Sequence, residues 1–172
     1  DPWTWEEFVE ASHKLTFTRA DGTQVYGFSA SSLPGQELYL PVFYMDGGRV
    51  RSPDARTFTL HQPEAVSGLQ KLADLHLVED VTPPDFGTMG QTDVRKQFKE
   101  GMVAMVMETP SFIAELESES LPFVVFPNPV GESGHLVTTG GFGMFGVVKV
   151  EDENVLAASH LFARYLTGLE VA

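Results

Sequence analysis

The sequence predicts an α/β fold, with a central mixed sheet flanked by helices. Along the 172 residues, short apolar runs that are typical of buried strands alternate with segments of helical periodicity. The clearest unit is residues 92–117, which read as a helix, a glycine stop, the apolar run Met102–Met107 and another helix opening at Thr109. An apolar run without alternation suits a strand that is covered on both faces. The unit holds no obvious nucleophile, metal cluster or phosphate loop, which indicates binding rather than catalysis.

The first helix has a strong start signal. Thr4 is a candidate N-cap, and Glu7 completes a capping box three residues later. Trp3 and Phe8 occupy the hydrophobic-staple positions on either side of that cap. After a polar turn, Val25–Phe28 is predicted to form a short strand.

The middle of the chain is predicted to hold two helices separated by a hairpin. Residues 36–45 are apolar and aromatic, and we interpret them as a buried helix in spite of Pro41. Residues 49–60 are predicted to form a hairpin around a Ser-Pro-Asp turn. Pro63 suits the first position of a helix whose apolar spacing continues to His76.

The second half continues the alternation of strands and helices. Beyond the unit at 92–117, further strands are predicted at 122–126 and 145–150. A last helix is predicted to begin near Asp152 and to stop at Gly168, with one apolar stripe along its length.

Composition excludes several classes of function. The formal net charge of −13 argues against a nucleic-acid partner, because phosphate binding needs a basic surface. The absence of cysteine excludes disulfides and thiol chemistry, and it suits an exported protein. The sequence has no apolar run near the roughly 20 residues of a membrane span.

A nucleotide-binding alternative rests on the glycines at 141–146, which form a literal G-x-G-x-x-G. In a dinucleotide-binding unit these glycines lie between a strand and a helix whose N-terminus faces the pyrophosphate. Here residues 147–150 have strand character and the next helix opens only near Asp152. The glycines are better explained by a bend or by close approach of the backbone to a ligand.

No metal or catalytic site is predicted. The histidines have no partner at metal-ligand spacing. The carboxylates of Glu115, Glu117 and Glu119 have the pattern of a solvated helix end rather than of a catalytic pair across a cleft. We therefore expect no cofactor and no metal.

Aromatic residues near turns are the remaining candidates for a site. They flank the turns at 46–48, 109–110 and 139–141, and aromatic faces stack on the apolar faces of sugar rings. Core packing explains any one of them, but the set favours a pocket. Its members are Trp3, Trp5, Tyr39, Phe43, Tyr44, Phe86, Phe112 and Phe142.

Several ordered motifs resemble a known family. They are P-W-T-W-E-E-F at 2–8, F-Y-M-D-G-G at 43–48, F-K-E-G-M-V-A-M at 98–105, T-T-G-G-F-G-M-F-G-V at 138–147 and A-R-Y-L-T-G at 163–168. Their order and spacing resemble the extracellular solute-binding proteins of ABC importers, family 1, the maltose- and multiple-sugar-binding type. The resemblance covers nearly the whole chain.

The resemblance implies a domain organisation. Family members have two α/β lobes of the periplasmic-binding-protein type II, and ligand lies in the cleft between them. This chain resembles the second lobe alone: residues 1–139 would be the second-lobe domain, 140–150 an inter-lobe crossing strand, and 151–172 a helix that packs on the missing first lobe. In isolation, the apolar stripe of the 152–167 helix would need another partner, such as a second copy of the chain.

The resemblance also implies a function without catalysis. The protein would capture a sugar or oligosaccharide outside the cytoplasm, in the periplasm or as a cell-surface lipoprotein, and deliver it to a membrane permease; its leader would be absent from this chain. The family usually places a tryptophan near Ser111, and Ser111 stands in its place. The implied ligand-binding residues are Tyr44, Glu108, Thr109, Ser111, Phe112, Gly140, Gly141 and Phe142.

Overall fold

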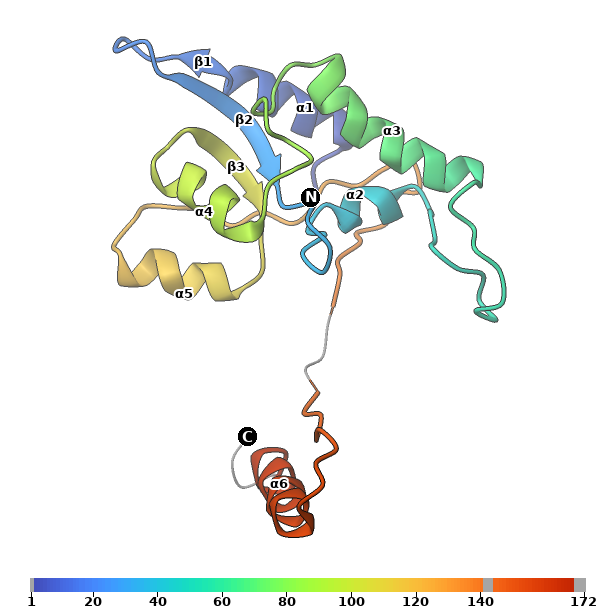
Figure 1. Cartoon of the computed structure of the whole chain (residues 1–172). Coiled ribbons are helices and arrows are strands. Elements are labelled where there is room, and N and C mark those ends of the chain that lie inside the picture. The colour runs from blue at the N-terminus through green and yellow to red at the C-terminus, as the bar shows by residue number, and fades with distance from the viewer. Residues whose placement is uncertain (1, 141–143, 169–172) are drawn as a thin grey trace. The chain divides into compact units, whose positions relative to one another are not determined.

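A computed structural model of the chain describes residues 2–140 and 144–168, and it divides into two compact units, Asp1–Thr139 and Gly140–Ala172 (Figure 1). The first unit contains α1 (Trp5–Lys14), β1 (Phe17–Thr18), β2 (Gln24–Ala30), α2 (Leu40–Met45), α3 (Pro63–Leu77), α4 (Gln91–Lys99), β3 (Val103–Met107) and α5 (Ser111–Ser118). The second unit contains α6 (Glu153–Leu166). None of the helices in the described ranges has the length and apolar character needed to cross a membrane.

The sheet is small and mixed, as the sequence predicts. Its strand order is β1-β2-β3, with β1 antiparallel to β2 and β2 parallel to β3. Ala30 lies opposite Met107, so the two parallel strands end at the same level. The residues that follow them therefore lie at one edge of the sheet, which is where open α/β sheets usually bind ligands.

The start of α1 confirms the predicted capping box and staple. The Glu7 amide donates to Thr4 Oγ1 at 3.2 Å, and the Thr4 amide donates to the Glu7 carboxylate at 2.8 Å. The rings of Trp3 and Phe8 meet edge to face, with their centroids 5.5 Å apart. Phe8 in turn packs edge to face on Phe28 of β2, at 5.0 Å. The local start signal thus also places α1 on the sheet.

Replacing Thr4 by alanine is expected to lower the free energy of unfolding by about 1 kcal/mol, because the Glu7 amide loses its acceptor. Urea denaturation followed by circular dichroism measures the change. The control is Thr138→Ala, since Thr138 is exposed and lies outside any helix or strand. Equal midpoints for Thr4→Ala and the wild type would show that the cap does not stabilise the fold.

The core brings α1, α2, α3 and the sheet together. Buried side chains from these elements form one cluster with Val81, which lies just after α3. The helix predicted at 36–45 is shorter than expected: α2 begins at Leu40 and carries Pro41 in its first turn. The missing proline N–H costs nothing there, because the amides of the first turn have no intrahelical acceptor. The main members of the cluster are Trp5, Phe8, Phe28, Ala30, Val42, Met45, Leu72, Leu75 and Met107.

Two predicted strands are absent from the described chain. Residues 122–126 have the right composition, but they form no ladder, and Val124, Val125 and Phe126 are exposed. Among residues 2–140 and 144–168, β3 pairs only with β2, and its central positions are half-buried rather than covered on both faces as predicted. Residues 144–150 also lie in no strand. Apolar composition permits a strand, whereas a paired neighbour is needed to make one.

The second unit consists mainly of α6, which starts where the sequence predicts. The Asp152 side chain accepts hydrogen bonds from the amides of Asn154 and Val155, at 2.8 and 3.3 Å. None of the residues of α6 is buried, and Leu161, Phe162 and Tyr165 are among its exposed side chains. The helix therefore presents apolar surface that the other described residues of its unit do not cover.

Candidate functional site

The turn between β3 and α5 brings four of the predicted site residues together. Glu108, Thr109, Ser111 and Phe112 follow β3 directly, at the edge of the sheet where β2 also ends. The predicted N-cap is displaced by one residue: α5 begins at Ser111, and Pro110 rather than Thr109 precedes it. The Thr109 carbonyl still accepts a hydrogen bond from the Phe112 amide, at 3.0 Å. This turn, with its supporting contacts, is called the β3–α5 corner below.

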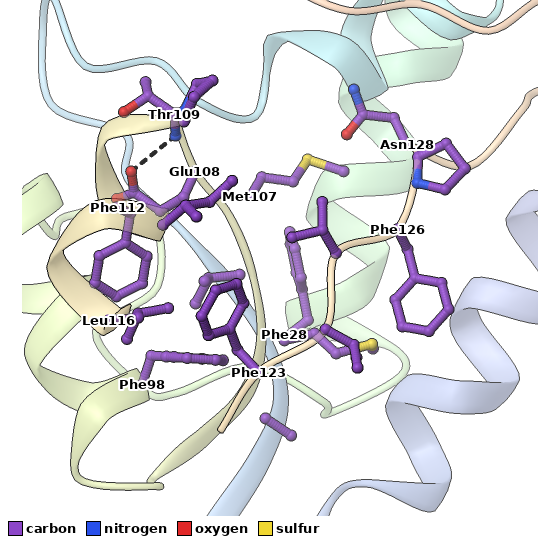
Figure 2. A pocket seen from close by; sticks show the side chains of 18 of the residues that line it. Phe28, Phe98, Met107, Glu108, Thr109, Phe112, Leu116, Phe123, Phe126 and Asn128 are labelled. Atoms are coloured by element: carbon purple, nitrogen blue, oxygen red, sulfur yellow. Dashed lines mark hydrogen bonds between the residues drawn. The ribbon is translucent and has the colours of Figure 1, made fainter. Parts of the chain in front are cut away.

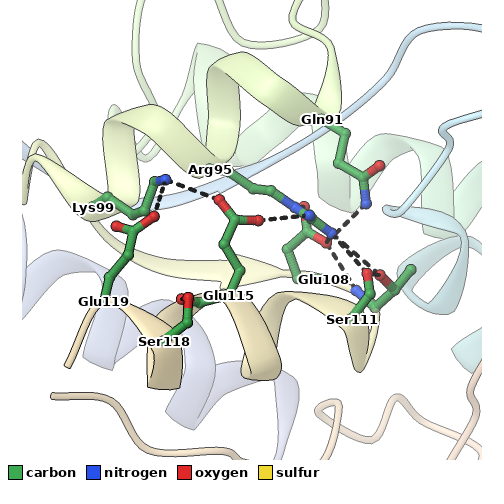
Figure 3. Close-up of polar contacts among 9 residues, drawn as sticks. Gln91, Arg95, Lys99, Glu108, Ser111, Glu115, Ser118 and Glu119 are labelled. Atoms are coloured by element: carbon green, nitrogen blue, oxygen red, sulfur yellow. Dashed lines mark hydrogen bonds and ion pairs between the residues drawn. The ribbon is translucent and has the colours of Figure 1, made fainter. Parts of the chain in front are cut away.

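The Glu108 carboxylate accepts four hydrogen bonds inside the corner (Figure 3). Arg95 donates to it twice, from Nε at 3.1 Å and from Nη2 at 2.9 Å. Gln91 Nε2 and the Thr109 amide each donate to Glu108 Oε2, both at 2.9 Å. The Glu108 side chain is only 7% exposed. The sequence analysis implied that Glu108 binds ligand, but here its carboxylate accepts hydrogen bonds from the protein itself.

Arg95 of α4 is the centre of the polar contacts in the corner. Besides Glu108, its guanidinium donates to Glu115 at 2.9 Å and lies over the Phe112 ring, 4.8 Å from the centroid. Hydrogen bonding to Glu108, assisted by the charges of Glu108 and Glu115, raises the pKa of Arg95 above its ordinary value. The guanidinium therefore stays charged at every relevant pH and can only donate hydrogen bonds.

Lys99 extends the network to the end of α5. Its ammonium group donates to Glu115 at 2.8 Å and to Glu119 at 2.9 Å. Hydrogen bonding to Lys99 holds the pKa of Glu115 below its ordinary value. Glu115 and Glu119 are thus paired with α4, and their side chains remain 32% and 43% exposed, so the predicted solvated helix end also forms ion pairs. A sequence signal exists: Arg95 and Lys99 are four residues apart, as are the two glutamates, so each pair shares a helix face.

A cavity of about 440 Å³ lies between β3, α5 and residues 122–129 (Figure 2). Glu108, Thr109 and Asn128 supply polar groups to its lining, which is otherwise largely apolar. Phe112 also lines the cavity, but it is only 3% exposed and packs edge to face on Phe98 at 5.7 Å. The ligand-binding role expected for Phe112 stays a prediction, and little of its ring is exposed for stacking on a sugar. Phe112 instead packs against the Arg95 guanidinium.

The other predicted site residues do not join the corner. Tyr44 lies in α2, half-buried, with its ring against Phe43 and the Arg49 guanidinium 5.8 Å from its centroid. Tyr44 does not line the cavity that Glu108 and Thr109 line. Gly140 is the first residue of the second unit, and Gly141 and Phe142 lie outside the described residues.

Asp46 joins three segments of the chain, although the sequence analysis treated it only as a turn residue. Its carboxylate accepts hydrogen bonds from Ser67 and Lys71 of α3 and from the Glu132 amide. Burial alone would raise the pKa of Asp46, but these hydrogen bonds and the charge of Lys71 outweigh it, and the pKa lies below its ordinary value. A second hydrogen bond joins the same segments, because Ser133 Oγ donates to the Met45 carbonyl at 2.7 Å.

Neither metal nor dinucleotide chemistry gains support from the described residues. No group of three or more His, Asp or Glu side chains in those ranges could hold a metal ion. The dinucleotide alternative requires a helix directly after the glycines at 141–146, but residues 146–152 contain none and α6 begins at Glu153.

Comparison with known proteins decides the family. The sequence profile of the bacterial extracellular solute-binding proteins matches residues 1–172, the whole chain. The chain belongs to this family. A comparison with curated proteins found no significant match.

Solved structures agree with membership of the solute-binding family. The chain is similar to maltose-bound MalE3 of T. maritima, with 25% identity and a TM-score of 0.75 over 99% of this chain and 44% of that one. It is similar to MalE of Bdellovibrio bacteriovorus bound to maltotriose, with 17% identity and a TM-score of 0.75 over 99% and 45%. The match to Lmo0181 of Listeria monocytogenes in complex with cycloalternan has 21% identity and a TM-score of 0.69 over 98% and 41%.

These matches establish the fold of the solute-binding chain as that of the periplasmic-binding-protein type. The chain spans less than half the length of each of the three matched structures. The family and the matched structures are binding proteins rather than enzymes.

Proposed function

We propose that this chain is part of the substrate-binding component of an ABC importer. Outside the cytoplasm, the component would capture a sugar or oligosaccharide in an inter-lobe cleft and deliver it to a membrane permease. The observation that carries the proposal is the whole-chain match to the extracellular solute-binding family. The ligands named for the three matched structures, maltose, maltotriose and cycloalternan, are all saccharides.

In this proposal, residues 1–139 form the second lobe, 140–150 cross to the first lobe, and 151–172 pack on that lobe. The division of the structure between Thr139 and Gly140 supports the boundary. The uncovered apolar surface of α6 supports a partner for that helix, because exposed apolar patches usually mark an interface. The lobe would contribute one wall of the cleft, built on the β3–α5 corner.

An isolated lobe supplies only part of the ligand contacts, so residues 1–172 alone are expected to bind maltose and maltotriose weakly or not at all. The longer protein, in which this chain is joined to a first lobe, is expected to bind a saccharide, because hinge closure adds the contacts of the second wall. Isothermal titration calorimetry with maltose, maltotriose and cycloalternan measures both forms.

Two outcomes would contradict the proposal in different ways. Micromolar saccharide binding by residues 1–172 alone would show that one lobe is sufficient and that the inter-lobe cleft is not required. Failure of the two-lobe protein to bind any of a broad saccharide panel, together with saturable NAD binding, would reject the sugar-binding function itself.

A further inference from the structure

Arg95 contacts several side chains at the β3–α5 corner. Its guanidinium donates to Glu108 and Glu115, and Nη2 also donates to Thr109 Oγ1 at 3.3 Å and to Ser111 Oγ at 3.1 Å. The side chain is 17% exposed and lies against the Phe112 ring. A planar fork held in this way fixes the positions of the groups around it, which a flexible lysine could not do.

The hydrogen bonds of the two hydroxyls limit what they can offer to a ligand. Thr109 Oγ1 and Ser111 Oγ lie 2.8 Å apart and share one hydrogen bond. A hydroxyl has one donor and two acceptor sites, and the guanidinium only donates. Nη2 carries two hydrogens and also donates to Glu108 Oε2, so the two hydroxyls share its other hydrogen, and the bond between them uses one of the two O–H donors. The other O–H donor is available for a ligand, in a direction away from Arg95.

The charges of the corner decide which ligand group suits that donor. Arg95 and Lys99 face the carboxylates of Glu108, Glu115 and Glu119 in one connected network. The sum is one negative charge, so the corner does not attract an anionic group. A cationic group would find the Glu108 carboxylate already occupied by Arg95 and Gln91. The ligand group that suits the remaining O–H donor is therefore an uncharged oxygen acceptor.

We propose that Arg95 is a positioning residue that withholds Glu108 from the ligand and orients the Thr109–Ser111 hydroxyl pair to donate to an uncharged oxygen. The corner would thereby select neutral saccharides over acidic or basic ones. This inference rests on the proposed sugar-binding function and adds a ligand class and a mechanism of selection to it.

The first test needs no ligand. Hydrogen exchange of residues 1–172 is compared between Arg95→Lys and Lys96→Met, a variant that removes one positive charge from an exposed position on the same helix. The amides of Thr109 and Phe112 are expected to exchange about tenfold faster in Arg95→Lys and at the wild-type rate in Lys96→Met. Unchanged exchange in Arg95→Lys would overturn the positioning role, whatever the ligand is.

The second test uses the two-lobe protein with maltose and with maltobionate, the acid obtained by oxidising its reducing end. The wild type is expected to prefer maltose, and Arg95→Lys is expected to lose about tenfold in maltose affinity, while Lys96→Met stays within about twofold. Loss of folded protein lowers the fitted number of binding sites and leaves the Kd of the folded molecules unchanged, so a change in Kd reports on the site itself. Tighter binding of maltobionate than of maltose by the wild type would overturn the selection of neutral ligands.

The double variant Arg95→Met/Glu108→Gln separates charge balance from positioning. It removes the ion pair without leaving a buried charge unpaired, so it is expected to fold but not to recover maltose affinity. Full recovery would overturn the role of Arg95. If the wild type binds no saccharide at all, the proposed function fails, and the hydrogen-exchange result still decides whether Arg95 fixes the corner.

Discussion

Replacing Gly27 by alanine is expected to lower the free energy of unfolding by about 3 kcal/mol, the upper part of the range for overpacked cores. A Cβ at Gly27 would lie 2.1 Å from the Ser12 carbonyl oxygen and 2.7 Å from the Ser12 Cα. Both atoms belong to the α1 backbone, so the whole helix must move. Thr16 adds to the constraint, because its hydroxyl donates to the Ser12 carbonyl and accepts from the Gly27 amide.

Thermal unfolding measures the effect of this substitution. A loss of that size corresponds to a decrease in Tm of roughly 6–12 °C for a protein of this length. The control is Gly146→Ala, because a Cβ there would meet no atom within 4 Å and the residue does not have a positive φ. A Gly27→Ala protein that unfolds together with the wild type would show that α1 does not pack on β2 as described.

Replacing Asp46 by asparagine is expected to lower the free energy of unfolding by about 2 kcal/mol at neutral pH, because Lys71 loses its charged partner. The Asp46 side chain is 5% exposed, and it joins the end of α2 to α3 and to residues 131–133. Chemical denaturation measures the loss. Asp85→Asn, which removes one charge from an exposed loop, is the control and is expected to stay within about 0.5 kcal/mol of the wild type.

The same carboxylate makes stability depend on pH. The folded state holds the pKa of Asp46 below its ordinary value, so the ionised form is stabilised by folding. This contribution is present in full above the unfolded pKa of about 4 and is lost as the pH falls through the folded pKa. The wild type should therefore lose more stability than Asp46→Asn between about pH 5 and pH 2. Parallel stability–pH curves for the two proteins would contradict the role of Asp46.

Elements with local signals were predicted well. The capping box at Thr4 and Glu7 and the Asp152 N-cap depend on contacts within three residues, and all of these contacts form. The apolar run that became β3 and the proline start of α3 are equally local. Residues 122–126 show the limit of this reasoning, because a strand also needs a neighbour at the right distance, and within the described ranges β3 pairs only with β2.

The sequence placed Glu108, Thr109 and Ser111 together after β3, but it did not show their contacts. Glu108, Thr109 and Ser111 lie at the sheet edge, as expected from the end of an apolar strand. Their partner Arg95 is on another helix, 13 residues before Glu108, and no motif identified it. Phe112 was assigned to the ligand through the family resemblance, whereas its burial against Phe98 depends on packing.

The sequence by itself determined the family, the α/β class and the starts of α1 and α6, since these follow from residue type and short spacing. Only the tertiary structure decided that Glu108 is held by Arg95, that Asp46 joins three segments and that residues 122–126 stay unpaired. The physical reason is the range of the interactions. Caps and periodicity act within a few residues, whereas ion pairs, burial and strand pairing depend on which distant segments the fold brings into contact.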